Sequence, residues 1–169
     1  MPNFLRSFLF IALIVSGVVV SGSGQGQQDR AALRLVGLDG VAHEVMPEAW
    51  GKLPRTTVKA KDHGGAIVAF EGVAARELLK LVAAPLGPEL RGQQLTLYTT
   101  AEGADGYKVV YALAEFDTDF TDGLILIADR KGGEVLPPKE GPLRMVVPWE
   151  KRQARWVRQL TVLRLGQAP

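Results

Sequence analysis

Short segments rich in aliphatic and β-branched residues recur from residue 32 to the end of the chain, each bounded by glycine, proline or Asp-Gly turns. This pattern is typical of strands of about five residues joined by tight turns. The predicted strands are 32–36, 56–58, 66–70, 95–99, 107–111, 123–128, 144–147 and 157–165. The first of them precedes Asp39-Gly40, which predicts a hairpin.

Two helices are expected among these strands. A short helix is predicted to begin at 46–50 and to end by Pro54. Pro47 suits its first turn, because the N–H that proline lacks would have no partner there. A longer one is predicted over 73–84 from its helical spacing of apolar residues. Its apolar face carries Ala74, Leu78, Leu81 and Val82, and its charged face carries Arg76, Glu77 and Lys80. With no internal repeat or linker, the chain is predicted to form a single mixed α+β domain with a few short helices.

The N-terminal residues have the features of a secretory leader. Arg6 precedes an apolar run over 8–20, and small residues follow at 21–24. The run is shorter than the roughly 20 residues that span a membrane, although an uncleaved anchor is the alternative interpretation. We therefore expect a signal peptide over 1–24, a domain over 25–169, a periplasmic or secreted location, and no stable membrane span after cleavage.

Composition excludes several classes of function. The chain of 169 residues carries 20 basic and 18 acidic side chains, a balance that does not favour nucleic-acid binding. It has no cysteine, which excludes disulfides, thiolate metal ligands and cysteine nucleophiles. After the leader it also has no serine, and His43 and His63 lack the spacing of a zinc site.

Two polar segments are interpreted as structural. Asp105-Gly106 is typical of a turn, with Tyr107 packing on the sheet. An acidic run at Glu115, Asp117, Asp119 and Asp122 does not fit the spacing of a calcium loop, and it is predicted to be a solvated loop.

The C-terminal third of the chain carries a more specific pattern. The stretch 132–148, with Gly-Pro-Leu-Arg-Met-Val-Val-Pro at its end, is followed by Arg-Trp-Val-Arg-Gln-Leu-Thr-Val over 155–162. Together they resemble the motifs of the sulfite-oxidase-type molybdopterin-binding domain family. Leu53-Pro54, 70–73, 104–107 and 113–115 look like upstream landmarks of the same family, in the same order. The resemblance implies the fold of that family and a molybdopterin cofactor.

One departure from the family bears on activity. In the catalytic members a cysteine sulfur binds molybdenum just after the strand that here runs over 57–61, and this chain has Asp62-His63-Gly64-Gly65 there. Oxygen or imidazole ligands are harder and donate less electron density than a thiolate. The resemblance therefore implies a domain without the usual oxygen-atom transfer.

Basic residues gather near the C-terminus, within the family's second motif. Lys151, Arg152, Arg155 and Arg158 accompany Trp149 and Trp156, and Arg144 lies shortly before them. Guanidinium groups grip a pyrophosphate and an indole can stack on a pterin, although a core tryptophan among solvated arginines is the alternative. The predicted cofactor-binding residues are Asp62, His63, Tyr107, Arg144, Arg152 and Arg155. No catalytic or metal-ligating residue is assigned.

The sequence thus leaves three hypotheses. The leading one is an exported protein that binds a molybdopterin-type cofactor, a pterin or another small anion without redox turnover, with an exported redox protein as a partner. The second is a molybdenum-dependent oxidoreductase with Asp62 or His63 as the metal ligand. The third is a structural or interaction module that uses the same fold.

Overall fold

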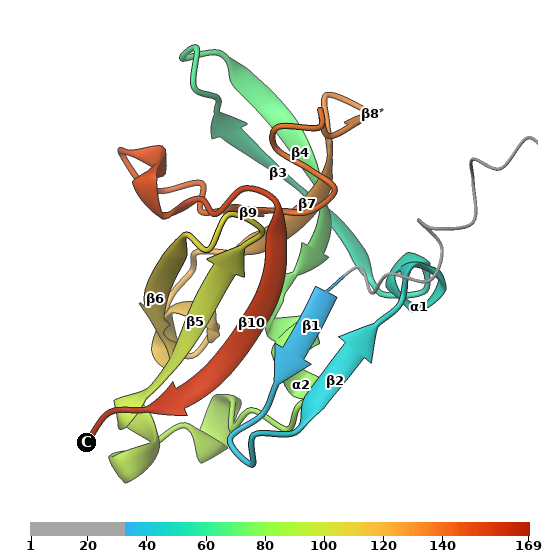
Figure 1. The fold of residues 1–169 in the computed structure, drawn as a ribbon. Coiled ribbons are helices and arrows are strands. Elements are labelled where there is room, and N and C mark those ends of the chain that lie inside the picture. Colours follow the sequence, from blue (N-terminus) through green and yellow to red (C-terminus); the bar gives the residue numbers. More distant parts are fainter. Residues whose placement is uncertain (1–32) are drawn as a thin grey trace, which may run out of the picture.

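The computed structural model describes residues 33–169, so the predicted signal peptide and residues 25–32 lie outside the described part. Two five-stranded sheets make up the fold (Figure 1). The first has the order β2-β1-β10-β5-β6, with bounds Ala42–Val45, Leu33–Val36, Leu160–Gln167, Leu97–Gly103 and Lys108–Ala112. The second has the order β3-β4-β7-β8, with bounds Arg55–Lys61, Ile67–Ala74, Leu126–Lys131 and Glu134–Val135, and β9 (Arg144–Val146) also pairs with β7.

The last strand occupies the centre of the first sheet. Strand β10 runs parallel to β1 on one side and antiparallel to β5 on the other. Strand β5 alternates between buried and half-buried residues, as expected for a strand with one face on the core. The predicted hairpin is confirmed, because β1 and β2 pair antiparallel and Gly40 has the positive φ of 76° that the turn requires.

Helices are few and short, as the predicted α+β class requires. They are α1 (Pro47–Gly51), α2 (Ala75–Lys80), and the 3-10 turns η2 (Gly87–Glu89), η3 (Gly92–Thr96), η4 (Leu113–Phe116) and η5 (Gln153–Arg155). The helix predicted over 73–84 is wrong in its extent. Val73 and Ala74 pair with β7 as the end of β4, so strand pairing overrides their helical spacing, and Leu81 is 43% exposed.

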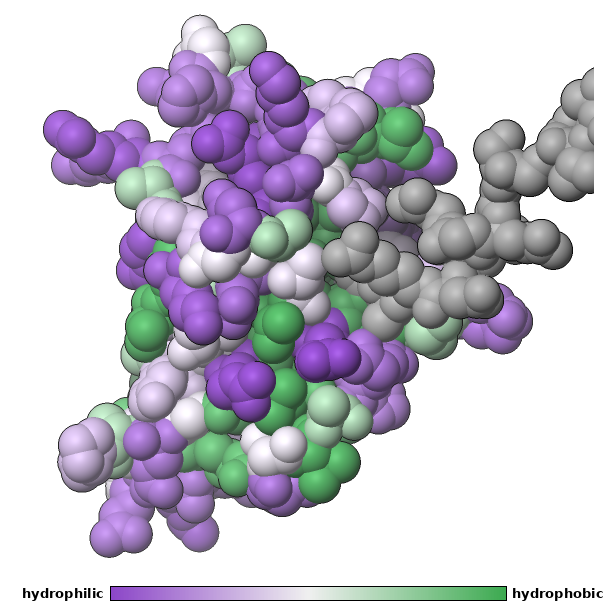
Figure 2. All heavy atoms as spheres, viewed as in Figure 1, coloured by the Kyte–Doolittle hydropathy of each residue, from purple (hydrophilic) through white to green (hydrophobic). Residues whose placement is uncertain are grey.

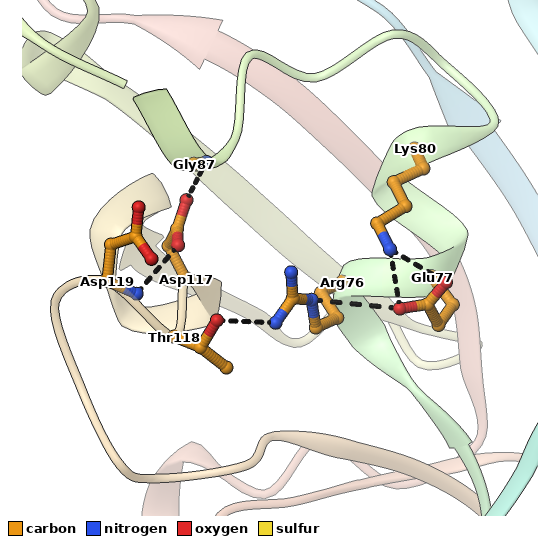
Figure 3. Close-up of polar contacts among 7 residues, drawn as sticks. All are labelled: Arg76, Glu77, Lys80, Gly87, Asp117, Thr118 and Asp119. Atoms are coloured by element: carbon orange, nitrogen blue, oxygen red, sulfur yellow. Dashed lines mark hydrogen bonds and ion pairs between the residues drawn. The ribbon is translucent and has the colours of Figure 1, made fainter. Parts of the chain in front are cut away.

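The acidic segment is not wholly the solvated loop that the sequence predicts. Asp117 is only 1% exposed, and its carboxylate accepts hydrogen bonds from the backbone N–H groups of Gly87 and Asp119 (Figure 3). The neighbouring Thr118 accepts a 2.7 Å bond from Arg76 on α2. A buried carboxylate needs such donors, so Asp117 ties two loops together.

The core lies between the two sheets and contains two aromatic side chains, Phe70 and Trp156, that contact each other. Phe70 and Trp156 are 0% and 4% exposed and meet edge to face, with ring centroids 5.9 Å apart. Within residues 33–169 no helix is long and apolar enough to cross a membrane.

Gly72 marks the closest approach of two strands. It follows a bulge in β4, and a Cβ atom there would lie 2.0 Å from the carbonyl oxygen of Ile127 on β7. The backbone must shift to admit any side chain, so we expect Gly72→Ala to lower the free energy of unfolding by about 3 kcal/mol. Urea denaturation measures this. Gly64→Ala is the control, since nothing lies within 4 Å of its Cβ position, and an equal loss in both variants would contradict the argument.

Candidate functional site

The loop 150–156, which contains η5, is the meeting point of elements that are distant in sequence. Tyr107, just before β6, donates a 2.7 Å hydrogen bond to the carbonyl oxygen of Ala154. Gln153 donates its side-chain amide to the carbonyl oxygen of Lys61 at the end of β3. The loop is therefore held from both sheets.

Arg155 lies at the centre of a first cluster of side chains, which also contains Glu115, Glu150 and Tyr111. Its Nη2 is 2.7 Å from Glu115 Oε2, and its Nε is 3.2 Å from Glu150 Oε1 without pointing along a hydrogen bond. The guanidinium lies over the Tyr111 ring, 4.1 Å from its centroid, and the Tyr111 hydroxyl donates to the Arg155 carbonyl. Burial raises the pKa of Tyr111, which keeps that hydroxyl protonated as a donor.

Glu150 is the carboxylate whose environment is least favourable to its charge. Its side chain is 15% exposed. Burial raises the pKa of Glu150 and the charge of Glu115 adds to the shift, while Arg155 and a hydrogen bond from the Trp156 indole oppose it. The cluster thus holds one carboxyl group that takes up a proton more readily than an ordinary glutamate.

Arg144 is the centre of the second cluster. It is 3% exposed, and its guanidinium carbon lies 5.7 Å and 5.3 Å from the ring centroids of Phe70 and Trp156. It donates to the Glu140 carboxylate and, at 2.9 Å, to Gln153 Oε1. A buried guanidinium between rings and acceptors has few ways to move, so Arg144 positions the loop through Gln153.

Lys131 extends this cluster to the turn between β3 and β4. Its Nζ lies 2.6 Å from Asp62 Oδ2 and 3.6 Å from Glu140 Oε1. Although burial acts in the opposite direction, the hydrogen bond from Lys131 holds the pKa of Asp62 below its usual value. Asp62 is therefore ionised and paired at neutral pH.

The structure brings together four of the six predicted residues. Tyr107 and Arg155 contact or belong to the loop 150–156, and Asp62 and Arg144 reach it through Lys131, Glu140 and Gln153. His63 and Arg152 are exposed, and neither side chain makes a hydrogen bond or ion pair within residues 33–169. Tyr107 does not simply pack on the sheet as predicted, because it is 50% exposed and bonds the loop instead.

Unpartnered polar atoms concentrate at this site. Among residues 33–169, seven buried side-chain nitrogen or oxygen atoms have no hydrogen-bond partner, and five of them belong here. They are Asp62 Oδ1, Arg144 Nε, Glu150 Oε2, Arg155 Nε and Trp156 Nε1. Several of these atoms nonetheless face one another, because Arg155 Nε lies 3.2 Å from Glu150 Oε1 and a hydrogen bond from the Trp156 indole acts on Glu150.

Sequence reasoning missed most of the partners. Glu115 and Lys131 reach the site from η4 and β7, and no local spacing connects either of them to the C-terminal motif. Glu150 stands beside the basic cluster in the sequence, but no local pattern assigns it to the site. The sequence around these residues does not predict contacts between elements that are distant along the chain.

A cavity of about 490 Å³ lies elsewhere in the fold. None of the six predicted residues lines it. Its lining includes Trp50 and Asp129, and Asp129 Oδ2 accepts 2.7 Å bonds from the Trp50 indole and from Arg55. The Asp129 carboxylate is thus already paired.

Comparison with known proteins assigns the family. The model of the oxidoreductase molybdopterin-binding domain matches residues 42–167. The chain belongs to this family. Its fold is similar to the crystal structure of the sulfane dehydrogenase SoxCD from Paracoccus pantotrophus, with a TM-score of 0.60 and 22% identity. The match covers 82% of this chain and 38% of that chain, and a search of curated proteins gives no match.

The site fits the organic part of a molybdopterin better than a metal ion. The donor set contains no thiol, and within residues 33–169 no three histidine, cysteine, aspartate or glutamate side chains are grouped to hold a metal. The N–H donors and carboxylate oxygens of Arg155, Trp156 and Glu150 are of the kind that meets the edge of a pterin ring, although here they already face one another.

The Asp62–Lys131 pair makes a testable contribution to stability. Because the folded pKa of Asp62 is lowered, its contribution is fully present above the unfolded pKa and is lost as pH falls through the folded pKa. We expect Asp62→Asn to lower the free energy of unfolding by about 1 kcal/mol at pH 7, with the difference vanishing in acid below the usual aspartate range. Denaturation curves across pH measure this.

Asp122→Asn is the matched control. Asp122 is exposed and makes no side-chain hydrogen bond or ion pair within residues 33–169. Its substitution should leave stability unchanged at every pH, whereas a pH-independent effect of Asp62→Asn would show that charge pairing is not the cause.

Proposed function

We propose that this domain is an exported protein that binds a molybdopterin-type cofactor, or a related pterin or small anion, without redox turnover. The observation that carries the proposal is the match of the family model over residues 42–167, which include every residue of this site. Membership of the molybdopterin-binding family supports this choice of ligand.

Inner and outer residues of the site have different parts in this proposal. Arg155, Arg144 and Asp62 are the inner residues of the proposed site, with Tyr107 holding the loop. Arg152 and His63 are exposed and would face the phosphate. Figure 2 shows hydrophilic residues gathered over the end of the molecule where the β3–β4 hairpin lies, and unpaired cations at such an end attract anions.

The absence of redox turnover rests on the chemistry of the chain's own donors. A bound molybdopterin supplies sulfur donors for a metal, while the family's protein thiolate has no counterpart in Asp62-His63-Gly64-Gly65. Asp62 is also held by Lys131 at 2.6 Å. An exported redox protein remains the proposed partner, and its docking would place this site next to a second cofactor.

A second function has one observation in its favour. Asp62 Oδ1 is buried and unpartnered, at the position where the resemblance places the metal ligand of catalytic members. This supports a molybdenum-dependent oxidoreductase with Asp62 or His63 as a ligand. A structural or interaction module is the third candidate, and it requires no ligand at the site.

Binding of a pterin monophosphate tests the proposal. We expect saturable binding, followed by the change in pterin fluorescence. Arg152→Ala should weaken it about tenfold, because a charge-assisted hydrogen bond to phosphate is lost. Arg91→Ala is the control, since Arg91 is likewise exposed and without an ion pair within residues 33–169. The absence of any binding at millimolar ligand would contradict the proposal and leave the structural module.

Metal analysis separates the first two functions. We expect protein purified from its native compartment to contain no stoichiometric molybdenum, because the chain has no thiolate ligand. One molar equivalent of molybdenum that Asp62→Asn removes would favour the oxidoreductase and overturn the claim that turnover is absent.

A further inference from the structure

The charged side chains of the described residues are unevenly distributed. Segments 55–73 and 129–159, which contain most of the second sheet and the loop 150–156, carry 11 basic and 6 acidic side chains, whereas the other described residues carry 7 basic and 11 acidic ones. Figure 2 shows hydrophilic side chains gathered over the end of the molecule where the β3–β4 hairpin lies. A chain with a nearly balanced total charge therefore has one positively charged end.

Most of the positive charge at this end faces solvent without a partner. Four of the 11 basic side chains form ion pairs, with carboxylates of the same segments or with Glu115. The other seven are exposed and make no ion pair within residues 33–169: Lys59, Lys61, Arg130, Lys139, Lys151, Arg152 and Arg158. Of the acidic side chains in these segments, only Glu71 and Glu134 make no ion pair within the same residues.

Contacts within the site bring several of these cations to one surface. Lys61 ends β3, and its carbonyl oxygen accepts a hydrogen bond from Gln153, so it lies beside the loop that carries Gln153. Lys139 directly precedes Glu140, whose partner Lys131 also pairs with the residue after Lys61. We define the basic surface as the four exposed lysines of these segments, which are Lys59, Lys61, Lys139 and Lys151.

An exposed aromatic ring adjoins the basic surface. Trp149 stands two residues before Lys151 and is 45% exposed. Its six-membered ring covers Gly123, where an added Cβ atom would lie 2.6 Å from the ring carbon Cζ3. Because the ring rests on the backbone of another segment, it presents its open side to solvent in a fixed position. An aromatic centre with a charged rim is typical of protein interfaces.

The arrangement favours a protein over other anionic partners. A small oxyanion needs donors that converge on one point, whereas these lysines belong to three segments and are all exposed. An apolar anchor such as Trp149 needs an apolar counterpart, which a protein surface offers. Strand β3 is an edge of the second sheet, and lysines on an edge hinder the addition of a further strand. We therefore expect docking through side chains.

We propose that the basic surface and Trp149 form a docking surface for an acidic protein, with Trp149 as the apolar anchor. This inference rests on the proposed function only in taking an exported protein as the partner, and it adds the charge of that partner and the place where it docks. The surface adjoins the loop 150–156, so the docked protein lies next to the candidate site. Docking requires no bound cofactor.

Two peptides serve as probes of the full chain. The acidic peptide is rich in glutamate and contains leucine and phenylalanine, and the neutral peptide has glutamine in place of every glutamate. We expect the acidic peptide to bind, with a change in tryptophan fluorescence, and the neutral peptide not to bind. Added salt should weaken the binding, because exposed charges are screened. Titration calorimetry measures the affinities.

Variants of the docking surface test its two parts. Lys59→Glu and Lys151→Glu should each weaken binding of the acidic peptide about threefold to fivefold, since each reverses a charge that faces the peptide. Trp149→Ala should weaken it about tenfold, because an aromatic anchor at the centre of an interface contributes most of the affinity. The same variant should also remove the change in fluorescence.

Arg91→Glu and Leu95→Ala are the matched controls for charge and for apolar exposure. Both residues are exposed and belong to or adjoin η3. This turn precedes β5, which begins opposite the C-terminal end of β10, so η3 lies at the other end of the first sheet from the loop 150–156. Neither control should alter the affinity. Circular dichroism and urea denaturation check that every variant keeps the fold.

Three results would overturn the inference. They are the absence of binding of the acidic peptide at millimolar concentration, an unchanged affinity in Trp149→Ala, and equal losses in Arg91→Glu and Lys151→Glu, which would show that only net charge matters. Tighter binding to phosphatidylglycerol vesicles than to the acidic peptide would assign the surface to a membrane and contradict it as well.

Binding of the pterin monophosphate to the same protein keeps the two proposals apart. A chain that binds the pterin but not the acidic peptide retains the proposed function and loses the docking surface. A chain that binds the acidic peptide through Trp149 and the lysines, but not the pterin, retains the docking surface and loses the proposed function.

Discussion

The buried guanidinium of Arg144 is the interaction on which the site depends. It comes from the short strand β9, lies against the rings of Phe70 and Trp156, and bonds Glu140 and Gln153. Through these contacts one side chain connects the second sheet, the aromatic core and the loop 150–156. Removing one partner of such a buried pair leaves an uncompensated charge, at a cost of about 3–5 kcal/mol. The position of the loop is thus coupled to the stability of the core.

This arrangement explains why most arginines near the C-terminus are not a simple basic patch. Arg144 is enclosed and Arg155 is neutralised by two glutamates, whereas Arg152 stays exposed without an ion pair among the described residues. The inner donors are therefore already matched by carboxylates, and the positive charge without an ion pair among the described residues lies on the surface.

Much of the fold could be predicted from local patterns. The β1–β2 hairpin follows from its Asp-Gly turn, and the family resemblance lay in motifs that are contiguous in sequence, which the family match over 42–167 confirms. The helix over 73–84 was predicted too long because its first residues pair with β7, a contact about 50 residues away. Asp117 was predicted to be solvated for the same kind of reason, since its partner Gly87 lies 30 residues earlier.

The sequence by itself determined the strand-rich class, the family and the lack of a thiolate at the expected metal position, because each depends on residue identity or on neighbours along the chain. Only the tertiary structure decided which charges remain available. Glu115 and Lys131 meet Arg155 and Asp62 through the pairing of distant strands, and Coulomb interactions depend on distances in space rather than separation in sequence. The same arginines that looked like a grip for an anion are therefore, in the folded chain, partly occupied by the protein's own carboxylates.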